Sequence, residues 1–406
     1  ELFSRRRSRM NKQQRQSIGN FHQLVSQTYT IKQVNLSDEP IPEGLNCLVI
    51  AEPTKSFTDY ELYKIDQALM RGTNLAIFTP GLKQAKSPKK AQAMRSPATY
   101  VPMDTGLEKL LAHYGIRVKP AYVMDKNCYE QKMPRRLGGG RQPVYYAPII
   151  KNKNINHAPA FMKNIKGVVT LENSPVQIKE NIAEKNDLSA RPLFSSSAQS
   201  WLVKENIRLN PMMIQPPQAE EKFGSHGLAH LVEGRFPSYF VGKEIPAKKS
   251  SDKARGKAQK SNEPGARDAS AEKAPAEDAG GESAAETKAS AIRAENRFMA
   301  RGNPAKVLLV GSSGMLTDNV IDSKGESPNA AFVMNVIDGL NGRSEIAVLR
   351  SKTQQFNPLE ETAPAVRSLV RTGNIAGLPV LVALCGLLVW WRRSTRRRHI
   401  RKMFAE

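Results

Sequence analysis

Cysteine is scarce in this sequence, which has three cysteines among 406 residues. So few thiols cannot form a disulfide framework, and they show no paired spacing with histidine of the kind that binds zinc. Cys47 lies in an apolar run, where we expect a buried small side chain, and a bridge from Cys47 to Cys128 is a less favoured alternative. His226 and His230 stand at i and i+4, but the carboxylate of an H-E-x-x-H motif is missing between them. The sequence therefore predicts no metal site and no cofactor.

Catalytic and nucleotide-binding motifs are also missing. There is no G-x-S-x-G nucleophile elbow and no Walker A loop, and the glycine run 138–140 has no strand–helix context. Ser312 or Ser313 could serve as a nucleophile with one of the two histidines only by assumption, because no motif relates them. We therefore predict that the protein is not an enzyme and that any ATP hydrolysis belongs to a partner. The alternative is a membrane-anchored hydrolase or amidotransferase-like enzyme that acts on cell-envelope material.

Acidic residues are few: 38 Asp and Glu stand against 61 Lys and Arg, which gives a net charge of +23. Such a charge is typical of proteins that bind nucleic acid or an anionic surface. Aromatic residues make up only 6% of the chain, however, and no basic strand is interleaved with aromatics that could stack on bases. The charge is concentrated in the run Arg5–Arg9 and in the tail after Trp391. We expect no nucleic-acid partner, and we assign the tail to anionic membrane lipid.

Long hydrophobic runs are absent except for residues Ile375–Trp391, which hold no charge. As a helix this run would be roughly 25 Å long, close to the roughly 30 Å hydrocarbon core of a bilayer. It ends in Trp390 and Trp391 and is followed by the Arg-rich residues 392–406. These features predict a transmembrane helix at 375–391 in the bacterial inner membrane, and the positive-inside rule gives its orientation. Residues 392–406 would be cytoplasmic and the preceding body periplasmic; a buried core helix is the alternative.

A hydrophobic export signal is missing at the start of the sequence, which begins with Glu1. A body on the far side of the membrane needs such a signal. We expect upstream sequence to supply it.

Strand–helix–strand patterns indicate an α/β fold. Continuous apolar runs at Leu45–Ala51 and Asn74–Thr79 are typical of buried parallel strands. Between them, Thr58 and Glu61 form a capping box that predicts the start of a helix, and Gly72 suits its end. A short crossover of this kind predicts a Rossmann-like or flavodoxin-like, mostly parallel sheet.

The remaining elements follow from the same periodicities. We expect a basic helix over residues 5–27, an irregular excursion over 125–175 and a surface loop over 80–103. We also expect the following strands and helices: strands Tyr29–Leu36, Ile116–Val123, Gly167–Leu171, Ala305–Val310 and Ile346–Leu349, and helices over 104–114 and 328–340.

A compositional shift divides the body. Residues 243–303 are rich in Ala, Lys, Glu, Ser and Gly with almost no large apolar side chains, so we predict a disordered insertion there. The predicted organisation is an α/β domain built from 1–242 and completed by 304–365, followed by the membrane helix and the basic tail.

One weak ligand site is predicted at a strand end. Ser312, Ser313 and Asp318 follow the strand that ends at Val310, and a helix begins near Asn329. Crevices at the carboxyl ends of α/β strands bind ligands, but a well-bonded loop is the alternative. Arg235 could contact a ligand or partner, or pair with a carboxylate of the body.

Five stretches in this order resemble one known family, the GldG-like auxiliary component of ABC transport systems that was first associated with gliding motility. The matching stretches are Ile41–Pro53, Asp59–Gly72, Gly106–Val118, Gly234–Ser238 and Lys306–Ser313. The C-terminal apolar run with its Arg-rich tail matches as well.

The resemblance implies an extracytoplasmic α/β domain, tethered to the membrane, that works beside an ABC permease and its ATPase. It also implies a domain like that of intraflagellar transport proteins and a distant likeness to amidotransferase-like folds. An envelope polysaccharide or peptide is a conceivable ligand. The chain departs from the family at Gly311–Ser313, where the family often has Gly-Asp.

Overall fold

A computed structural model describes residues 17–85, 99–135, 139–246, 298–351 and 364–403. It divides the chain into two units, Glu1–Phe356 and Asn357–Glu406. The predicted basic helix lies outside the described residues up to residue 16, and so does most of the predicted insertion.

The first unit is built on a five-stranded sheet of order β1-β2-β14-β13-β11. Its strands are β1 (Cys47–Ala51), β2 (Asn74–Phe78), β14 (Ala305–Val310), β13 (Gly227–Gly234) and β11 (Ser189–Ser195). β1, β2 and β14 run parallel to one another, whereas β13 is antiparallel to both β14 and β11. The fold is therefore α/β with a mixed sheet, and only one half of it has the predicted parallel arrangement.

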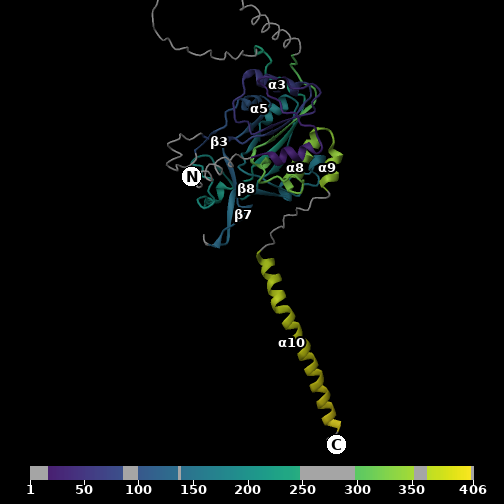
Figure 1. Cartoon of the computed structure of the whole chain (residues 1–406). Helices are drawn as coiled ribbons and strands as arrows, with labels where there is room; N and C mark the ends of the chain where they lie inside the picture. The colour runs from purple at the N-terminus through teal and green to yellow at the C-terminus, as the bar shows by residue number, and fades with distance from the viewer. Residues whose placement is uncertain (1–16, 86–98, 136–138, 247–297, 352–363, 404–406) are drawn as a thin grey trace, which may run out of the picture. The chain divides into compact units, whose positions relative to one another are not determined.

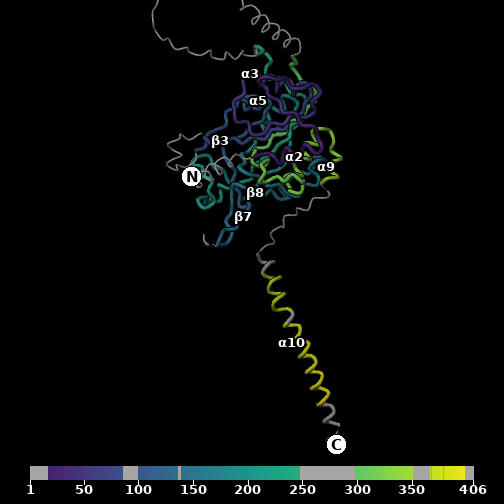
Figure 2. Tube along the Cα trace, in the orientation of Figure 1, coloured from purple at the N-terminus to yellow at the C-terminus, as the bar shows by residue number. Residues whose placement is uncertain are grey.

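β14 comes from late in the chain, yet it lies between β2 and β13, as the tube in Figure 2 lets the reader trace. Its sequence is apolar except for Lys306, which suits this central position because a central strand needs apolar side chains on both faces.

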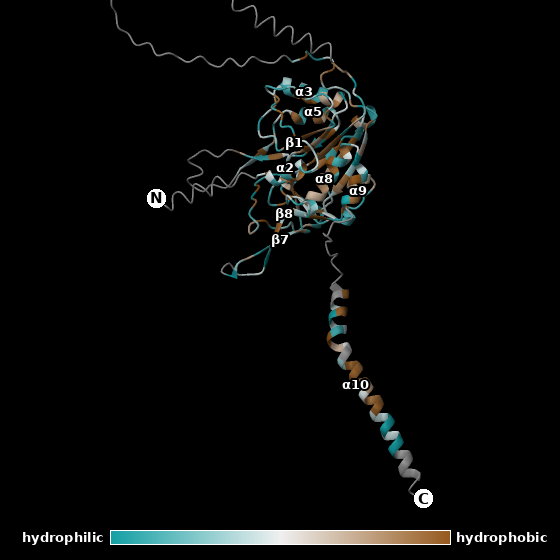
Figure 3. Cartoon of the chain, turned by 45° about the vertical axis from the view of Figure 1, so that its right-hand side comes forward, coloured by the Kyte–Doolittle hydropathy of each residue, from teal (hydrophilic) through white to brown (hydrophobic). Residues whose placement is uncertain are grey.

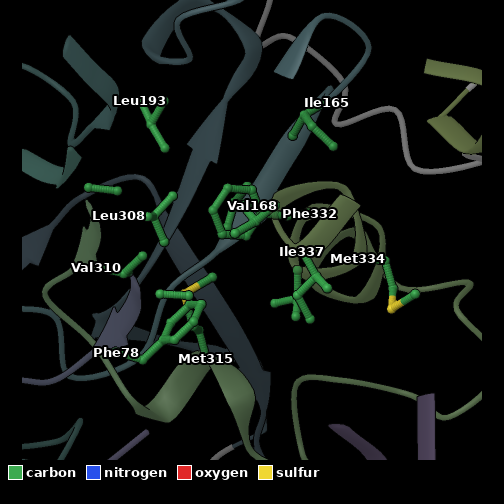
Figure 4. Close-up of a cluster of buried hydrophobic side chains, with 14 of the residues drawn as sticks. Phe78, Ile165, Val168, Leu193, Leu308, Val310, Met315, Phe332, Met334 and Ile337 are labelled. Carbon is green, nitrogen blue, oxygen red and sulfur yellow. The ribbon is translucent and has the colours of Figure 1, made fainter. Parts of the chain in front are cut away.

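Helices cover both faces of this sheet (Figure 1). Successive side chains of a strand point to opposite faces. Ile77 and Leu309 therefore pack with α3 (Asp59–Met70) and α5 (Leu107–His113). Their neighbours Phe78 and Leu308 pack instead with α2 (Gly19–Ser26) and α8 (Pro328–Leu340). Figure 4 shows this second cluster, with Leu308, Val310 and Phe78 facing the α8 residues Phe332 and Ile337.

The two main helices begin as their sequences predict. Thr58 accepts a hydrogen bond from the Glu61 backbone N–H, and the Glu61 carboxylate accepts one from the Thr58 backbone, so the capping box is confirmed. α3 ends before Gly72, whose φ of +98° is one that glycine adopts readily. α8 starts with Ser327 as N-cap and Pro328 in its first turn.

Three strand predictions are wrong in whole or in part. Residues 346–349 lie inside the helix α9 (Ser344–Ser351), and residues 29–36 form no strand. The predicted strand over 116–123 is split by Pro120 into β5 (Ile116–Val118) and β6 (Tyr122–Asp125). Short apolar runs fit a helix or a strand equally well, and Ala347 reaches the core from the helix.

Small sheets surround the central one. The predicted loop over 80–103 contains the ribbon β3 (Leu82–Gln84) and β4 (Tyr100–Pro102), and its residues 86–98 lie outside the described part. The predicted excursion holds β7 (Cys128–Lys132), β8 (Arg141–Lys151) and β9 (Gly167–Val169) in one sheet. The remaining elements are β10 (Val176–Ile178), which pairs with β5, β12 (Ser200–Val203), which pairs with β6, the helix α6 (Glu180–Lys185), and the short 3-10 turns Asn152–Asn154, Ala160–Met162, Glu220–Lys222 and Gly314–Leu316.

The second unit contains the helix α10 (Pro364–Met403). Its stretch Ser368–Arg397 is long and apolar enough to cross a membrane and includes the predicted span. Figure 3 shows apolar colouring along its middle part. Trp390 and Trp391 are exposed there, at 66% and 65% of their surface.

Candidate functional site at the carboxyl edge of the central sheet

The carboxyl ends of β2 and β14 lie side by side, because the Thr79 backbone N–H donates to the Val310 carbonyl. The chain that leaves β2 leads to α5 on one face, and the chain that leaves β14 leads to α8 on the other. Such a divergence opens the crevice in which α/β proteins bind ligands. The predicted site residues after Val310 therefore lie at the expected edge of the sheet.

The protein's own residues 169–175 fill this crevice. The Ser174 backbone N–H donates to the Gly311 carbonyl at 2.7 Å, and the Ser174 Oγ accepts from the Gly81 backbone N–H at 2.9 Å. A Cβ added to Gly311 would lie 1.9 Å from the Ser174 carbonyl oxygen. The backbones are thus in direct contact, and no ligand atom fits between them.

Two predicted ligand residues hold this filling segment in place. Ser312 is fully buried and donates its hydroxyl to the Leu171 carbonyl. Asn329 is also buried and exchanges two hydrogen bonds with the Val169 backbone, at 2.8 and 2.7 Å. The structure therefore brings Ser312 and Asn329 to one segment, and their polar groups bond to the chain itself.

The other three predicted residues lie apart from that contact. Ser313 is buried at the start of a 3-10 turn. Asp318 accepts a hydrogen bond from the Asn20 backbone N–H at 2.7 Å and so secures the first turn of α2. Arg235 is exposed and has no hydrogen bond or ion pair to any residue that the structure describes. These residues do not form one binding set.

Two glutamates that the sequence did not single out lie near this edge. Glu52 directly follows β1, and Glu172 belongs to the filling segment. Both have left-handed backbones, with φ of +46° and +52°, which costs about 1–2 kcal/mol for such a residue. Burial raises the pKa of both side chains, and the charge of Glu52 raises that of Glu172 further. Neither carboxylate has a hydrogen-bond or ion-pair partner within the described ranges.

Tyrosines surround Glu172. Burial raises the pKa values of Tyr100 and Tyr146, with the charge of Glu172 as the next cause, and that of Tyr100 reaches about 12. The pKa of Tyr122 is raised for the same two reasons. Its ring packs edge to face against that of Tyr100, with 5.7 Å between the ring centroids. In the sequence, only the position of Glu52 after an apolar strand could have indicated this acidic, aromatic region; Glu172 has no such signal.

A cleft lies beside the filled crevice, on the α5 side of the sheet. It has a volume of about 360 Å³ and is lined by residues 79–81 after β2, by α5, by β5 and by Lys179. The partly exposed Met103, Ala112 and Val118 form apolar walls, and three cations, Lys109, Arg117 and Lys179, also line it. This cleft begins at residues 79–81, directly after β2.

Comparison with known proteins identifies the family. Residues 8–336, more than half of the chain, match the auxiliary proteins described as "ABC-type uncharacterized transport system". The chain belongs to this family. Among curated proteins it is similar to an uncharacterized protein of Borreliella burgdorferi, at 24% identity over 230 residues. That match covers 54% of this chain and 42% of the relative.

Among solved structures, the chain of this ABC auxiliary protein aligns with one described as "mmIFT52 N-terminal domain". The TM-score is 0.40 at 11% identity, over 80% of this chain and 90% of the other.

A buried carboxylate joins three of the sequence stretches that carried the family resemblance. Asp66 of α3 is fully buried and accepts hydrogen bonds from the Tyr114 hydroxyl at 2.7 Å, the Ser238 hydroxyl at 2.7 Å and the Tyr239 backbone N–H at 2.8 Å. A fourth comes from the Gln67 side chain at 3.0 Å. The loop after β13 is therefore fastened to α3 and to the end of α5.

The chain on either side of residues 247–297 meets at the same place, and this includes the last residues of the predicted insertion over 243–303. The Ser238 backbone N–H donates to the Ala300 carbonyl, and the Gly302 N–H donates to the Phe236 carbonyl. Met299 also donates its backbone N–H to the side chain of Gln67. The segments in which the chain leaves and re-enters the body of this ABC auxiliary protein therefore lie next to each other beside α3.

Catalytic groups do not come together among the residues that the structure describes. Burial raises the pKa of the Cys47 and Cys128 thiols to about 12, so both stay protonated, and both are free. Burial lowers the pKa of His230 to about 4. No serine or cysteine side chain in the described ranges bonds to a histidine ring, and no three His, Cys, Asp or Glu residues there group as a metal site.

Proposed function

We propose that this protein is a non-catalytic, membrane-tethered auxiliary component of an ABC-type transport system. Its α/β body lies on the periplasmic side of the inner membrane and binds a ligand or a partner at the carboxyl edge of the sheet. An ABC permease and its ATPase supply the transport path and the energy.

The observation that carries the tether is the exposed apolar surface of α10. Leu381, Leu384 and Leu387 are exposed at 63%, 59% and 60%. Removing one such side chain from water contributes about 1.5–3 kcal/mol, so a helix with this surface is stable in lipid. Arg392 and Arg393 directly follow the tryptophan pair, and cationic residues favour the cytoplasmic side.

The filled crevice supports the non-catalytic part of the proposal. An α/β enzyme needs space at the strand ends for its substrate, and here Ser174 occupies the space between Gly81 and Gly311. The chain also has no Walker A loop, so nucleotide hydrolysis requires another subunit.

Topology is tested with single cysteines in a Cys-free background. Met212, 67% exposed in the body, is changed to Cys in one variant, and Arg397 in another. In intact spheroplasts a membrane-impermeant maleimide should label Met212→Cys and leave Arg397→Cys unlabelled until the cells are lysed. Labelling of Arg397→Cys before lysis, or release of the protein by carbonate washing, would overturn the proposed tether or its orientation.

Partnership is tested separately by mild-detergent purification of the full-length protein. A permease and an ATPase should co-purify with it. Absence of both subunits after crosslinking in the membrane would remove the transport role.

A further inference from the structure

The cleft beside α5 combines apolar walls with unpaired cations. Met103, Ala112 and Val118 are partly exposed and give the cleft its apolar surface. Its volume of about 360 Å³ falls in the range of small-molecule sites, which span roughly 300–1,000 Å³. The walls suit the apolar body of one small ligand.

The cations come from three separate elements. Lys109 lies on α5, Arg117 on β5 and Lys179 directly before α6, and all three are exposed. None has an ion-pair partner among the described residues. The one acid in the lining, Glu108, accepts hydrogen bonds from the Thr105 backbone and hydroxyl. Its carboxylate is therefore engaged locally, and the cations remain available to an anion.

Backbone contacts preform the cleft. A Cβ on Gly81 would lie 2.1 Å from the Lys119 carbonyl oxygen, so these two stretches of the wall touch directly. β5 pairs with β10, and the Lys179 backbone N–H donates to the Gly115 carbonyl at 2.8 Å. A site held in this way loses little conformational entropy when a ligand binds.

We propose that this cleft binds a small organic acid, with its apolar body against Met103, Ala112 and Val118 and its anionic group among Lys109, Arg117 and Lys179. The site lies beside the edge where α/β sheets hold ligands. This assignment rests on the proposed function, for which it names the ligand class of the periplasmic body.

The test uses the full chain in lipid nanodiscs, with empty nanodiscs as reference and calorimetry as readout. Hexanoate is the main probe, because it carries one anionic group on a short apolar body. Acetate lacks the apolar body, 1-hexanol lacks the charge and hexylammonium reverses it. Hexanoate should bind saturably. Hexanol and hexylammonium should bind at least about tenfold more weakly because they lose the charge-assisted contact, and acetate should bind at least about tenfold more weakly because it has no apolar chain to bury.

Two variants locate the binding. Combined Lys109→Gln, Arg117→Gln and Lys179→Gln should weaken hexanoate binding by roughly tenfold or more while hexanol binding stays unchanged. Ala112→Phe, at a partly exposed position in the lining, should block both probes by filling the cleft. The matched control is Lys163→Gln with Lys204→Gln, two exposed lysines outside the lining, which should leave binding as in the native protein.

Equal binding of hexanoate and hexylammonium would overturn the role of the cations. Binding that survives Ala112→Phe would overturn the location, and no saturable binding of hexanoate would overturn the ligand class. None of these results affects the labelling or co-purification tests, so failure of this inference and failure of the proposed function are distinguishable.

Discussion

Two acidic regions of the body, one fully buried and one partly buried, are built in opposite ways. The Asp66 carboxylate is surrounded by four hydrogen-bond donors from α3, the end of α5 and the loop after β13. Glu52 and Glu172 lie near each other with no such donors in the described ranges, and burial raises the pKa of both. A carboxylate thus holds elements of the fold together at Asp66, whereas at Glu52 and Glu172 its charge is unfavourable.

The difference shows which region lowers the stability of the fold. Hydrogen bonds offset the desolvation of a buried charge, as they do at Asp66. The two glutamates combine unpartnered charge with left-handed backbones, and strained residues persist only where surrounding structure over-determines them. Such sites are commonly functional rather than stabilising. We therefore expect substitution of Glu172 to leave the stability of the body intact and substitution of Asp66 to lower it.

Asp66→Ala should have the largest effect of the changes considered. It removes the acceptor of four hydrogen bonds and leaves the Tyr114 and Ser238 hydroxyls buried without their partner. We expect the free energy of unfolding to fall by about 3 kcal/mol or more, measured by urea denaturation of the full-length protein in detergent.

The control for that change is Asp59→Ala, at the exposed first turn of the same helix, where an acid contributes about 0.3–1 kcal/mol. Equal losses for the two variants would contradict the role given to Asp66.

Local patterns made much of the central fold predictable. The capping box at Thr58 and the apolar runs of β1, β2 and β14 are signals within a few residues, and the structure has these elements near the expected bounds. The direction of β13 was not predictable, because it depends on pairing with strands far away in the chain. Residues 346–349 were misassigned since four apolar residues carry no period that separates a helix from a strand.

The strand pattern was enough to predict that Ser312 and Asn329 lie at the edge of the sheet, but not which groups they contact there. Ser312 and Asn329 do lie together at the edge of the sheet. What occupies the crevice is the segment around Leu171, which is 141 positions away from Ser312. No local pattern announces that contact, and the left-handed backbone of Glu172 follows from it rather than from its own sequence.

Glu172→Gln should have a smaller effect of opposite sign at neutral pH. A raised carboxyl pKa means that the folded state holds its proton more strongly than the unfolded state, so stability is lost as pH rises from the ordinary value of 4.5 through the folded pKa. The Gln variant cannot ionise, so its Tm should exceed that of the native protein at pH 7.5, and the difference should vanish towards pH 4.5.

Scanning calorimetry over that pH range checks the result, with Glu205→Gln measured in parallel as the same substitution at an exposed position. A lower Tm for Glu172→Gln at pH 7.5 would mean that the charge of Glu172 has a partner that stabilises it.

Replacing residues 247–297 by a short Gly-Ser linker should have the smallest effect on the body. Both flanks are already fixed on α3: Ser238 bonds to Ala300, and Ile245 and Phe298 pack in one cluster with Tyr63. A short linker therefore joins two points that the fold already holds together, and the Tm should stay within about 2 °C of the native value, the shift that well under 1 kcal/mol produces in a domain of this size. Asp66→Ala in this shortened chain should lower the Tm as much as in the full chain, because its donors all lie outside the deleted residues. A large loss of Tm on shortening alone would show that residues 247–297 contribute contacts to the body, and the joint at Asp66 would then be only part of what closes it.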